Sequence, residues 1–141
     1  MSKSVRELRV WRIVAAHPVP RSEIQYKSLH LGDWLRQNYV SIGFDKKKQN
    51  PPMVRFRDQM KKGDRVVVTT DGYIWAIGEI TGPMYEREEP ELYENRRDVL
   101  WYKITRKDVK SFPAKLRNKL SQPHTVIPLS DNEWSTILAS I

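Results

Sequence analysis

The sequence contains no cysteine. A chain without cysteine has no disulfide framework, no cysteine nucleophile and no thiolate metal site. It also has no apolar run close to the length of about 18 residues that a membrane helix requires. Residues 1–8 include no apolar segment of the kind that a signal peptide needs. The sequence therefore predicts an intracellular, cytoplasmic protein that does not contact a membrane.

Motifs for nucleotide binding and for common catalytic chemistries are missing as well. The sequence has neither GxxxxGK[ST] nor GxGxxG, and it lacks the GxSxG motif of α/β-hydrolases. His17, His30 and His124 lie far apart, so none forms a metal-ligand pair, and a structural role is the simpler interpretation of each. We therefore expect no catalytic residue, no metal site and no cofactor. A Ser-His-Asp arrangement assembled by folding would leave no such motif, so a small nuclease or hydrolase stays open as an alternative.

Positive charge is abundant, with 25 Lys and Arg against 17 Asp and Glu in 141 residues. This excess favours an anionic partner. Residues 45–65 hold eight basic and three acidic side chains and residues 103–119 hold seven and one, whereas residues 84–98 hold three and six. If the two basic segments converge in space, they form a surface for a phosphate backbone; a solvated lysine-rich surface is the plainer interpretation. The candidate phosphate contacts are Lys46, Lys47, Lys48, Arg55, Arg57, Lys110, Lys115, Arg117 and Lys119.

Hydrophobic patterning predicts strands mixed with short helices. The predicted strands cover 9–15, 39–44, 66–68, 73–80, 99–104 and 125–129. The predicted helices begin at 22, with an interruption at 31–35, and cover 50–62, 113–120 and 130–141. The fold class is α+β, a small curved β-sheet or β-barrel with short helices packed outside. Residues 1–8 are predicted to form a loose arm and residues 9–141 a single domain.

Local motifs fix several of these boundaries. Asp71-Gly72 between two β-rich runs predicts a two-residue hairpin in which both residues have positive φ. Gly78 inside the second strand predicts a bulge or a close approach of another backbone. Pro128 places the last strand at a sheet edge. The segment 130–133, Ser-Asp-Asn-Glu, forms a capping box that opens the final helix.

Aromatic residues are numerous, with five Trp, six Tyr and three Phe. Trp11, Trp101 and Trp134 lie in periodic elements and are interpreted as core residues. Five others lie at loops or strand ends, where each can stack on a planar base with about 1–3 kcal/mol, although a core or surface position is equally open for any one of them. A pocket walled by three such aromatic rings suits an unpaired base, because the faces of bases stacked in a duplex are not accessible. The five are Trp34, Phe44, Trp75, Tyr85 and Tyr93.

Four segments resemble, in order, motifs of EVE-like domains, which belong to the PUA superfamily together with the YTH readers of N6-methyladenine in RNA. Residues 34–44, WLRQNYVSIGF, resemble the segment that ends in IG[WF]. Residues 60–68, MKKGDRVVV, and 77–80, IGEI, resemble two strands of these domains, and residues 99–102, VLWY, resemble a later one. The resemblance covers roughly residues 9–130 and implies a PUA/EVE-like fold.

Among EVE-like domains, the IG[WF] segment and the N-terminal WRI-V strand are most similar to the N-terminal DNA-binding modules of McrB-type, modification-dependent restriction proteins. The resemblance implies a pocket that takes a modified base flipped from duplex DNA, with Phe44 as one wall. It further implies a GTPase motor domain and a nuclease subunit as partners in the full system, since this chain has no motor motif. The candidate base-pocket residues are Phe44, Trp34, Tyr85, Tyr93, Trp75, Ser41 and Asp45.

The sequence thus predicts a recognition module, without enzyme activity of its own, that binds double-stranded DNA and flips a modified base into an aromatic pocket. N6-methyladenine, 5-methylcytosine and hydroxymethylcytosine all stay open as the modification. The first alternative is a PUA/YTH-like reader of a modified RNA base. A small nuclease or hydrolase and a protein-interaction domain are the others.

Overall fold

The computed structural model describes residues 7–15, 23–43, 45–89 and 92–141, with the backbone alone for 23–29. Its strands are β1 (Val10–Val14), β2 (Tyr39–Ile42), β3 (Arg65–Thr70), β4 (Tyr73–Ile80), β5 (Tyr85–Glu86), β6 (Asn95–Asp108) and β7 (Val126–Leu129). Its helices are α1 (Glu23–Gln37), α2 (Pro51–Val54), the π-helix η1 (Arg55–Gln59), the 3-10 helix η2 (Val109–Ser111), α3 (Ala114–Leu120) and α4 (Asp131–Ser140). None of the described helices has an apolar stretch long enough to cross a bilayer.

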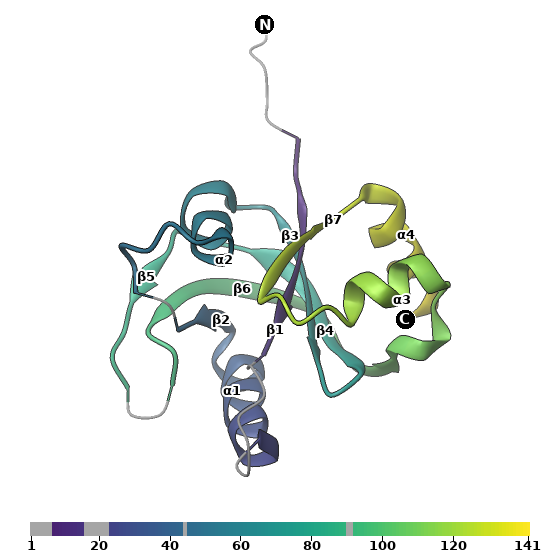
Figure 1. Cartoon of the computed structure of the whole chain (residues 1–141), viewed down its shortest axis with the longest axis horizontal. Helices are drawn as coiled ribbons and strands as arrows, with labels where there is room; N and C mark the ends of the chain where they lie inside the picture. The colour runs from purple at the N-terminus through teal and green to yellow at the C-terminus, as the bar shows by residue number, and fades with distance from the viewer. Residues whose placement is uncertain (1–6, 16–22, 44, 90–91) are drawn as a thin grey trace, which may run out of the picture.

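The strands form one curled sheet in the order β2-β6-β4-β3-β1-β7, with β5 beside β6. Strands β1 and β3 are parallel, and the other described pairs are antiparallel. Figure 1 shows β5 and α2 at one end of the molecule and α3 and α4 at the other. The predicted α+β fold, a curved sheet with short helices outside, is confirmed. Pro128 lies in the edge strand β7, as predicted.

Two apolar clusters hold the helices against the sheet. Because successive residues of a strand point to opposite faces, β1 contributes Trp11 to the cluster with α1, α2 and η1, and Val10 to the cluster with η2, α3 and α4. Trp11 and Trp134 are buried, as predicted. Trp101 is half-buried and packs against the first cluster.

The local motifs have the predicted geometry. Asp71 and Gly72 have φ of 54° and 81° and join β3 to β4. A Cβ on Gly78 would collide with the carbonyl oxygen of Leu100 and lie 3.0 Å from Cε3 of Trp101, and the β4–β6 register shifts next to it. The capping box also forms, since Ser130 Oγ accepts from the Glu133 amide and Glu133 Oε1 accepts from the Ser130 amide.

Three predicted boundaries were wrong. Helix α1 continues through 31–35 because Leu31, Trp34 and Leu35, spaced at helical intervals, all pack against the core. The helix predicted over 50–62 is instead α2 followed by the π-helix η1. Strand β6 begins at Asn95 rather than residue 99, because its first residues pair with β2.

Candidate nucleic-acid interface

In the described part of the acidic segment 84–98, β5 and the start of β6 form the two strands of a hairpin. Tyr85 pairs with Arg96, and the amide of Arg87 donates to the carbonyl oxygen of Glu94 at 2.8 Å. Strand β2 lies on the other side of the same part of β6. The hairpin therefore lies beside the end of β2. The predicted pocket residue Phe44 comes two residues after this strand in the sequence. Phe44 itself lies outside the described residues.

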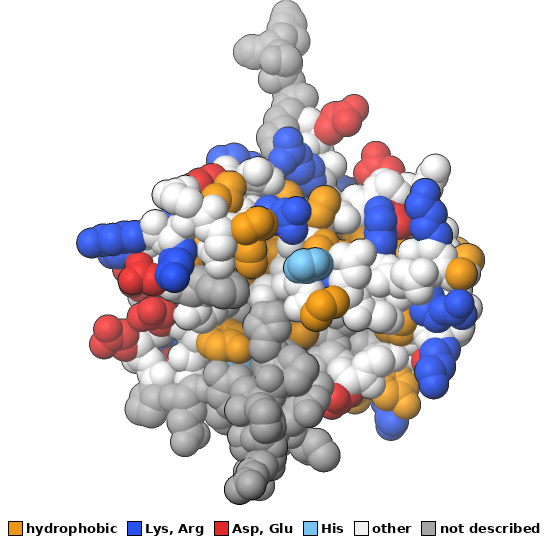
Figure 2. Space-filling view, viewed as in Figure 1, with side chains coloured by type: hydrophobic (Ala, Val, Ile, Leu, Met, Phe, Trp, Pro, Cys, Tyr) orange, Lys and Arg blue, Asp and Glu red, His pale blue; other side chains and the backbone are white. Residues whose placement is uncertain are grey.

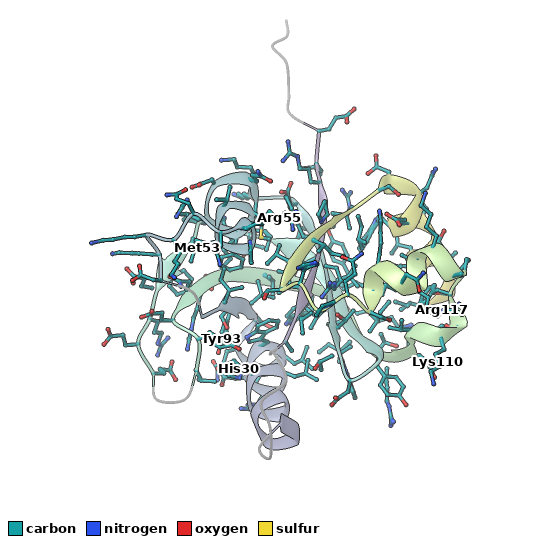
Figure 3. All side chains as sticks on the ribbon, in the orientation of Figure 1. His30, Met53, Arg55, Tyr93, Lys110 and Arg117 are labelled. Carbon is teal, nitrogen blue, oxygen red and sulfur yellow. The ribbon has the colours of Figure 1, made fainter. Side chains whose placement is uncertain are left out.

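Tyr93 is held in place at this point by two neighbours. Its ring centre is 4.2 Å from that of the buried His30, and its amide donates to His30 Nε2 at 3.3 Å. Figure 3 labels the two residues close together. Its ring also covers Gly43 so closely that a Cβ there would be 2.7 Å from Cε1 of Tyr93. Tyr93, one of the predicted pocket residues, is thus a fixed, half-buried aromatic wall next to position 44.

An open pocket of about 500 Å³ lies in front of Tyr93. Gly43 and Leu92 line it, together with the carboxylates of Glu88, Glu89 and Glu94. Its volume falls in the range of small-ligand sites. Carboxylates accept hydrogen bonds from the exocyclic amino group of a base but repel phosphate. The chemistry of this pocket therefore suits the edge of a base and not the nucleic-acid backbone.

Tyr85 lies on the neighbouring strand of the hairpin. Its hydroxyl donates to Asp98 Oδ1 at 2.7 Å. Burial and this hydrogen bond raise the pKa of Tyr85 to about 12. The phenol therefore stays protonated at neutral pH, and the half-buried ring is available as an aromatic surface.

Trp34 and Ser41 lie in the core and not at a pocket. Trp34 Nε1 donates to Ser41 Oγ at 2.9 Å, and the two residues are 0% and 1% exposed. The Ser41 hydroxyl thus provides the hydrogen-bond acceptor that the buried indole N–H of Trp34 needs. The prediction that these two residues contact a base is therefore corrected, because neither has surface on which a base could stack.

Trp75 also lies away from the hairpin. Its indole Nε1 donates to the carbonyl oxygen of Thr70 at 2.9 Å, close to the β3–β4 turn. The residues that flank it in β4 pair with 104–107 of β6, whereas Tyr85 pairs with Arg96. At about 3.3 Å per residue, roughly 30 Å of strand separates the two positions. Trp75 is therefore not part of the same pocket, contrary to the prediction.

The loop 45–48 is tied to the hairpin. Lys46 Nζ contacts Glu86 Oε1 at 2.8 Å, which raises the pKa of Lys46. Arg57 Nη1 donates to the carbonyl oxygens of Lys46 and Lys48 at 2.8 and 2.9 Å. The guanidinium of Arg57 also pairs with Asp58 and lowers the pKa of that carboxyl. Lys46 and Arg57, both predicted phosphate contacts, thus anchor the loop against β5 and η1.

The remaining side chains of this loop are exposed. Asp45 Oδ1 accepts from the Lys47 amide at 2.8 Å and turns the chain directly after position 44. Lys47 and Lys48 are exposed, and neither has an ion pair with a described residue. Figure 2 shows cationic and acidic side chains next to one another at this end of the molecule. Two exposed cations that pair with no described acidic residue therefore lie in the loop tied to the hairpin.

A basic groove that we did not predict adjoins the loop. It has a volume of about 590 Å³ and is lined by Arg57, Lys61, Lys62 and Arg97 together with Met60, Thr81, Gly82, Pro83 and Met84. Its described lining includes no carboxylate. Lys61 and Lys62 lie within the basic segment 45–65, so charge density was the signal that could have identified them.

The other predicted phosphate contacts do not join this group. Arg55 Nη1 donates to the carbonyl oxygen of Val126 at 2.7 Å and holds η1 against β7. Lys119 pairs with Glu133 at 2.8 Å. Figures 1 and 3 place Lys110 and Arg117 with η2 and α3, at the end of the molecule opposite β5, and Lys115 is exposed on α3. These residues of the second basic segment therefore lie away from the loop 45–48, so the condition for one joint phosphate surface is not met by them.

Among the residues that the structure describes, no three His, Asp or Glu side chains are arranged to hold a metal ion. The Tyr93 pocket has instead an aromatic ring and three carboxylates, and the adjoining loop and groove supply the cations. The arrangement can hold a planar, neutral group beside an anionic chain.

The fold resembles solved nucleic-acid-binding domains. The YTH domain of Zygosaccharomyces rouxii MRB1, in complex with N6-methyladenosine RNA, has a TM-score of 0.59 and 14% identity over 99% of this chain and 90% of that chain. Human THYN1, in complex with 5-methylcytosine-containing DNA, has a TM-score of 0.57 and 13% identity over 94% and 96%. The Pho92 YTH domain in complex with m6A has a TM-score of 0.60 and 13% identity over 99% and 87%. The predicted PUA/EVE-like fold, which these domains share, is thus confirmed.

Sequence comparison adds one match. A family model described as "Domain of unknown function (DUF8426)" matches residues 35–130. The matched segment runs from the end of α1 past β7 and includes the hairpin and the loop 45–48. No curated protein matches the sequence.

Proposed function

The chain belongs to the family described as Domain of unknown function (DUF8426), and we propose that it is a nucleic-acid reader that holds a modified base at the β5–β6 hairpin. The observation that carries this proposal is the position of Tyr93, held over Gly43 and against His30 in a hairpin that Lys46 ties to the lysine loop 45–48. Structures of the same fold are complexes with N6-methyladenosine RNA and 5-methylcytosine-containing DNA. These ligands belong to the class that we propose for this chain.

The base enters the pocket in front of Tyr93, with Phe44 proposed as a second wall. Asp45, which follows Phe44, is proposed to hydrogen-bond the edge of the base. Glu88 and Glu94 accept from an exocyclic amino group of the base. A methyl group buried against the rings adds about 0.8 kcal/mol, which corresponds to about fourfold in affinity.

The backbone of the nucleic acid passes over the lysines and not over the hairpin. Lys47 and Lys48 in the loop and Lys61 and Lys62 in the groove contact phosphates, while the acidic hairpin repels them. Such contacts supply affinity and register but no sequence preference. We expect them to make binding fall steeply with salt.

We propose double-stranded DNA as the substrate, with the modified base flipped out of the helix. In this proposal the chain is the recognition module of a modification-dependent restriction system, whose GTPase motor and nuclease lie in other domains or subunits. The second candidate function is a reader of a modified RNA base, which the N6-methyladenosine RNA complex of the similar MRB1 YTH domain favours.

The test is a binding panel of matched DNA duplexes and single-stranded RNAs, each unmodified or carrying one methylated adenine or cytosine. Fluorescence anisotropy should show one modified member bound about fourfold or more tightly than its unmodified partner. The Tyr93→Ala variant should lose this preference. The matched control is Tyr73→Ala, which removes a tyrosine at the β3–β4 turn and should keep the preference.

The panel also separates the alternatives. A preference confined to RNA selects the RNA reader. Equal affinity for all members in the wild-type protein rejects the reader function and leaves a nonspecific basic surface. Cleavage of labelled DNA by the pure protein with Mg²⁺ would support the nuclease alternative instead.

A further inference from the structure

Arg96 is a buried arginine with one edge unused. It is 2% exposed, its guanidinium lies 4.2 Å from the ring centre of Tyr39, and its Nη1 contacts Glu89 Oε1 at 3.2 Å. Its Nε and Nη2, which form the side edge of the guanidinium, have no hydrogen-bond partner among the described residues. Buried donors without partners are unfavourable, so this edge is suited to a ligand that presents two acceptors side by side.

Arg96 lines a second cavity, of about 370 Å³, between the end of α1 and the hairpin. Asp33, Glu89 and Asp98 line the same cavity, as do Tyr85 and a second arginine, Arg87, whose Nε contacts Glu89 Oε1 at 3.0 Å. Asp98 uses one of its oxygens on the Tyr85 hydroxyl. The lining of the cavity thus combines Arg96, two of whose donors are buried without a partner among the described residues, with several acceptors and an aromatic ring.

The carboxylates decide between the ligands that an arginine edge can take. Carboxylate, phosphate and guanine all present two acceptors in one plane. A phosphate or carboxylate ligand would meet three negative side chains, Asp33, Glu89 and Asp98, against the two positive ones, Arg87 and Arg96, so the lining keeps a net negative charge. Guanine is neutral, presents O6 and N7 on one edge and carries donors on the neighbouring edge, where the carboxylates can accept. Adenine places its amino group beside N7 and so offers only one acceptor to the arginine.

We propose that this cavity binds a guanine base, with Nε and Nη2 of Arg96 donating to O6 and N7. Glu89 lines both this cavity and the Tyr93 pocket, so the two are neighbours. The guanine therefore lies next to the modified base on the same strand. The position of the guanine beside a modified base rests on the proposed function, whereas the binding of guanine itself is argued from the residues that line the cavity.

The first test changes the ligand and leaves the protein intact. The probes are unmodified single-stranded oligothymidylates with one central guanine, 7-deazaguanine, inosine or adenine, and in a second arm GMP and 7-deaza-GMP. Loss of N7 or replacement by adenine should weaken binding about tenfold, and inosine, which lacks the amino donor, should also bind more weakly. Equal binding of guanine, 7-deazaguanine and adenine in the oligonucleotide arm, together with equal binding of GMP and 7-deaza-GMP in the second arm, overturns the proposal.

The two arms separate the sources of the base. A guanine preference in the oligonucleotide arm supports a base within a strand, and one in the GMP arm alone rejects that placement in favour of a free nucleotide. No probe in this series carries a modified base. If guanine is preferred in this series and the modified-base panel shows no preference for a modified base, only the proposed reader function is rejected. The reverse result rejects only the guanine site.

The second test changes Arg96 and a matched arginine. Arg96→Lys keeps the positive charge over Tyr39 but lacks the paired donors of a guanidinium edge, and it should abolish the guanine preference. Arg106→Lys is the control, because Arg106 lies in the same strand and also covers a tyrosine ring, that of Tyr73 at 4.5 Å; it should keep the preference. A folded Arg96→Lys protein that still prefers guanine contradicts the proposal. If this variant does not fold, the ligand series on the wild-type protein is the deciding test.

Discussion

Replacing Gly43 with alanine removes the close approach that positions Tyr93. The added methyl group would lie 2.7 Å from Cε1 and 3.2 Å from Cγ of Tyr93, while ordinary contacts begin at 3.4 Å. Gly43 does not have a positive φ, so alanine fits its backbone without strain. The ring must therefore move away from β2, and its contact with His30, now 4.2 Å between ring centres, is disturbed.

The size of the effect follows from two opposing contributions. Overpacking of this kind costs about 1–3 kcal/mol. Replacing glycine with alanine at a compatible backbone position stabilises by about 0.4–1 kcal/mol, because it restricts the unfolded chain. We expect Gly43→Ala to be less stable than the wild-type protein by about 1–2 kcal/mol, and its preference for a modified base to fall with the displaced ring.

Urea unfolding and the binding panel measure the two effects. The control is Gly82→Ala, where nothing lies within 4 Å of the added methyl and φ is not positive. This variant should be neutral or slightly more stable. If Gly43→Ala unfolds at the same urea concentration as Gly82→Ala and keeps its base preference, Gly43 does not position Tyr93.

Two further changes test the core and the loop. Ser41→Ala leaves the buried Trp34 Nε1 without its acceptor. Thermal or urea unfolding should show a free energy of unfolding lower by about 1–3 kcal/mol, with unchanged base preference. Unchanged stability with a lost base preference would show that Ser41 contacts the base. Replacing Lys47 and Lys48 together with alanine should weaken binding to every nucleic acid alike and lower the salt slope by about 1–2. Lys115→Ala at the other end should do neither, and an affinity loss confined to modified ligands would show that the two loop lysines are not simple phosphate contacts.

Patterns that depend on neighbours in the chain were predictable. The Asp71-Gly72 turn and the 130–133 capping box each form from residues that are adjacent or three positions apart, and both have the expected geometry. The interruption predicted in α1 was wrong because the apolar residues at 31–35 are held by distant core residues. Local propensity did not include that packing.

The aromatic residues show where sequence reasoning stopped. Trp34 and Tyr93 both lie in segments that looked irregular, yet Trp34 is fully buried against Ser41 and Tyr93 lines an open pocket. What separates them is a set of contacts between β2, α1 and the hairpin. His30, which sequence analysis placed only in a structural role, turned out to support Tyr93 from 63 residues away.

The sequence by itself determined the positive charge, the turns and caps, the strand-rich α+β fold and the presence of an acidic segment with two tyrosines. Each follows from composition or from short-range patterns of polarity and backbone preference. Only the tertiary structure decided which cations surround that segment and which aromatic rings reach a surface. It alone left one edge of Arg96 without a hydrogen-bond partner among the described residues. These features depend on contacts such as that of Lys46 with Glu86, 40 residues apart, because charge pairing and burial are set by which strands lie side by side.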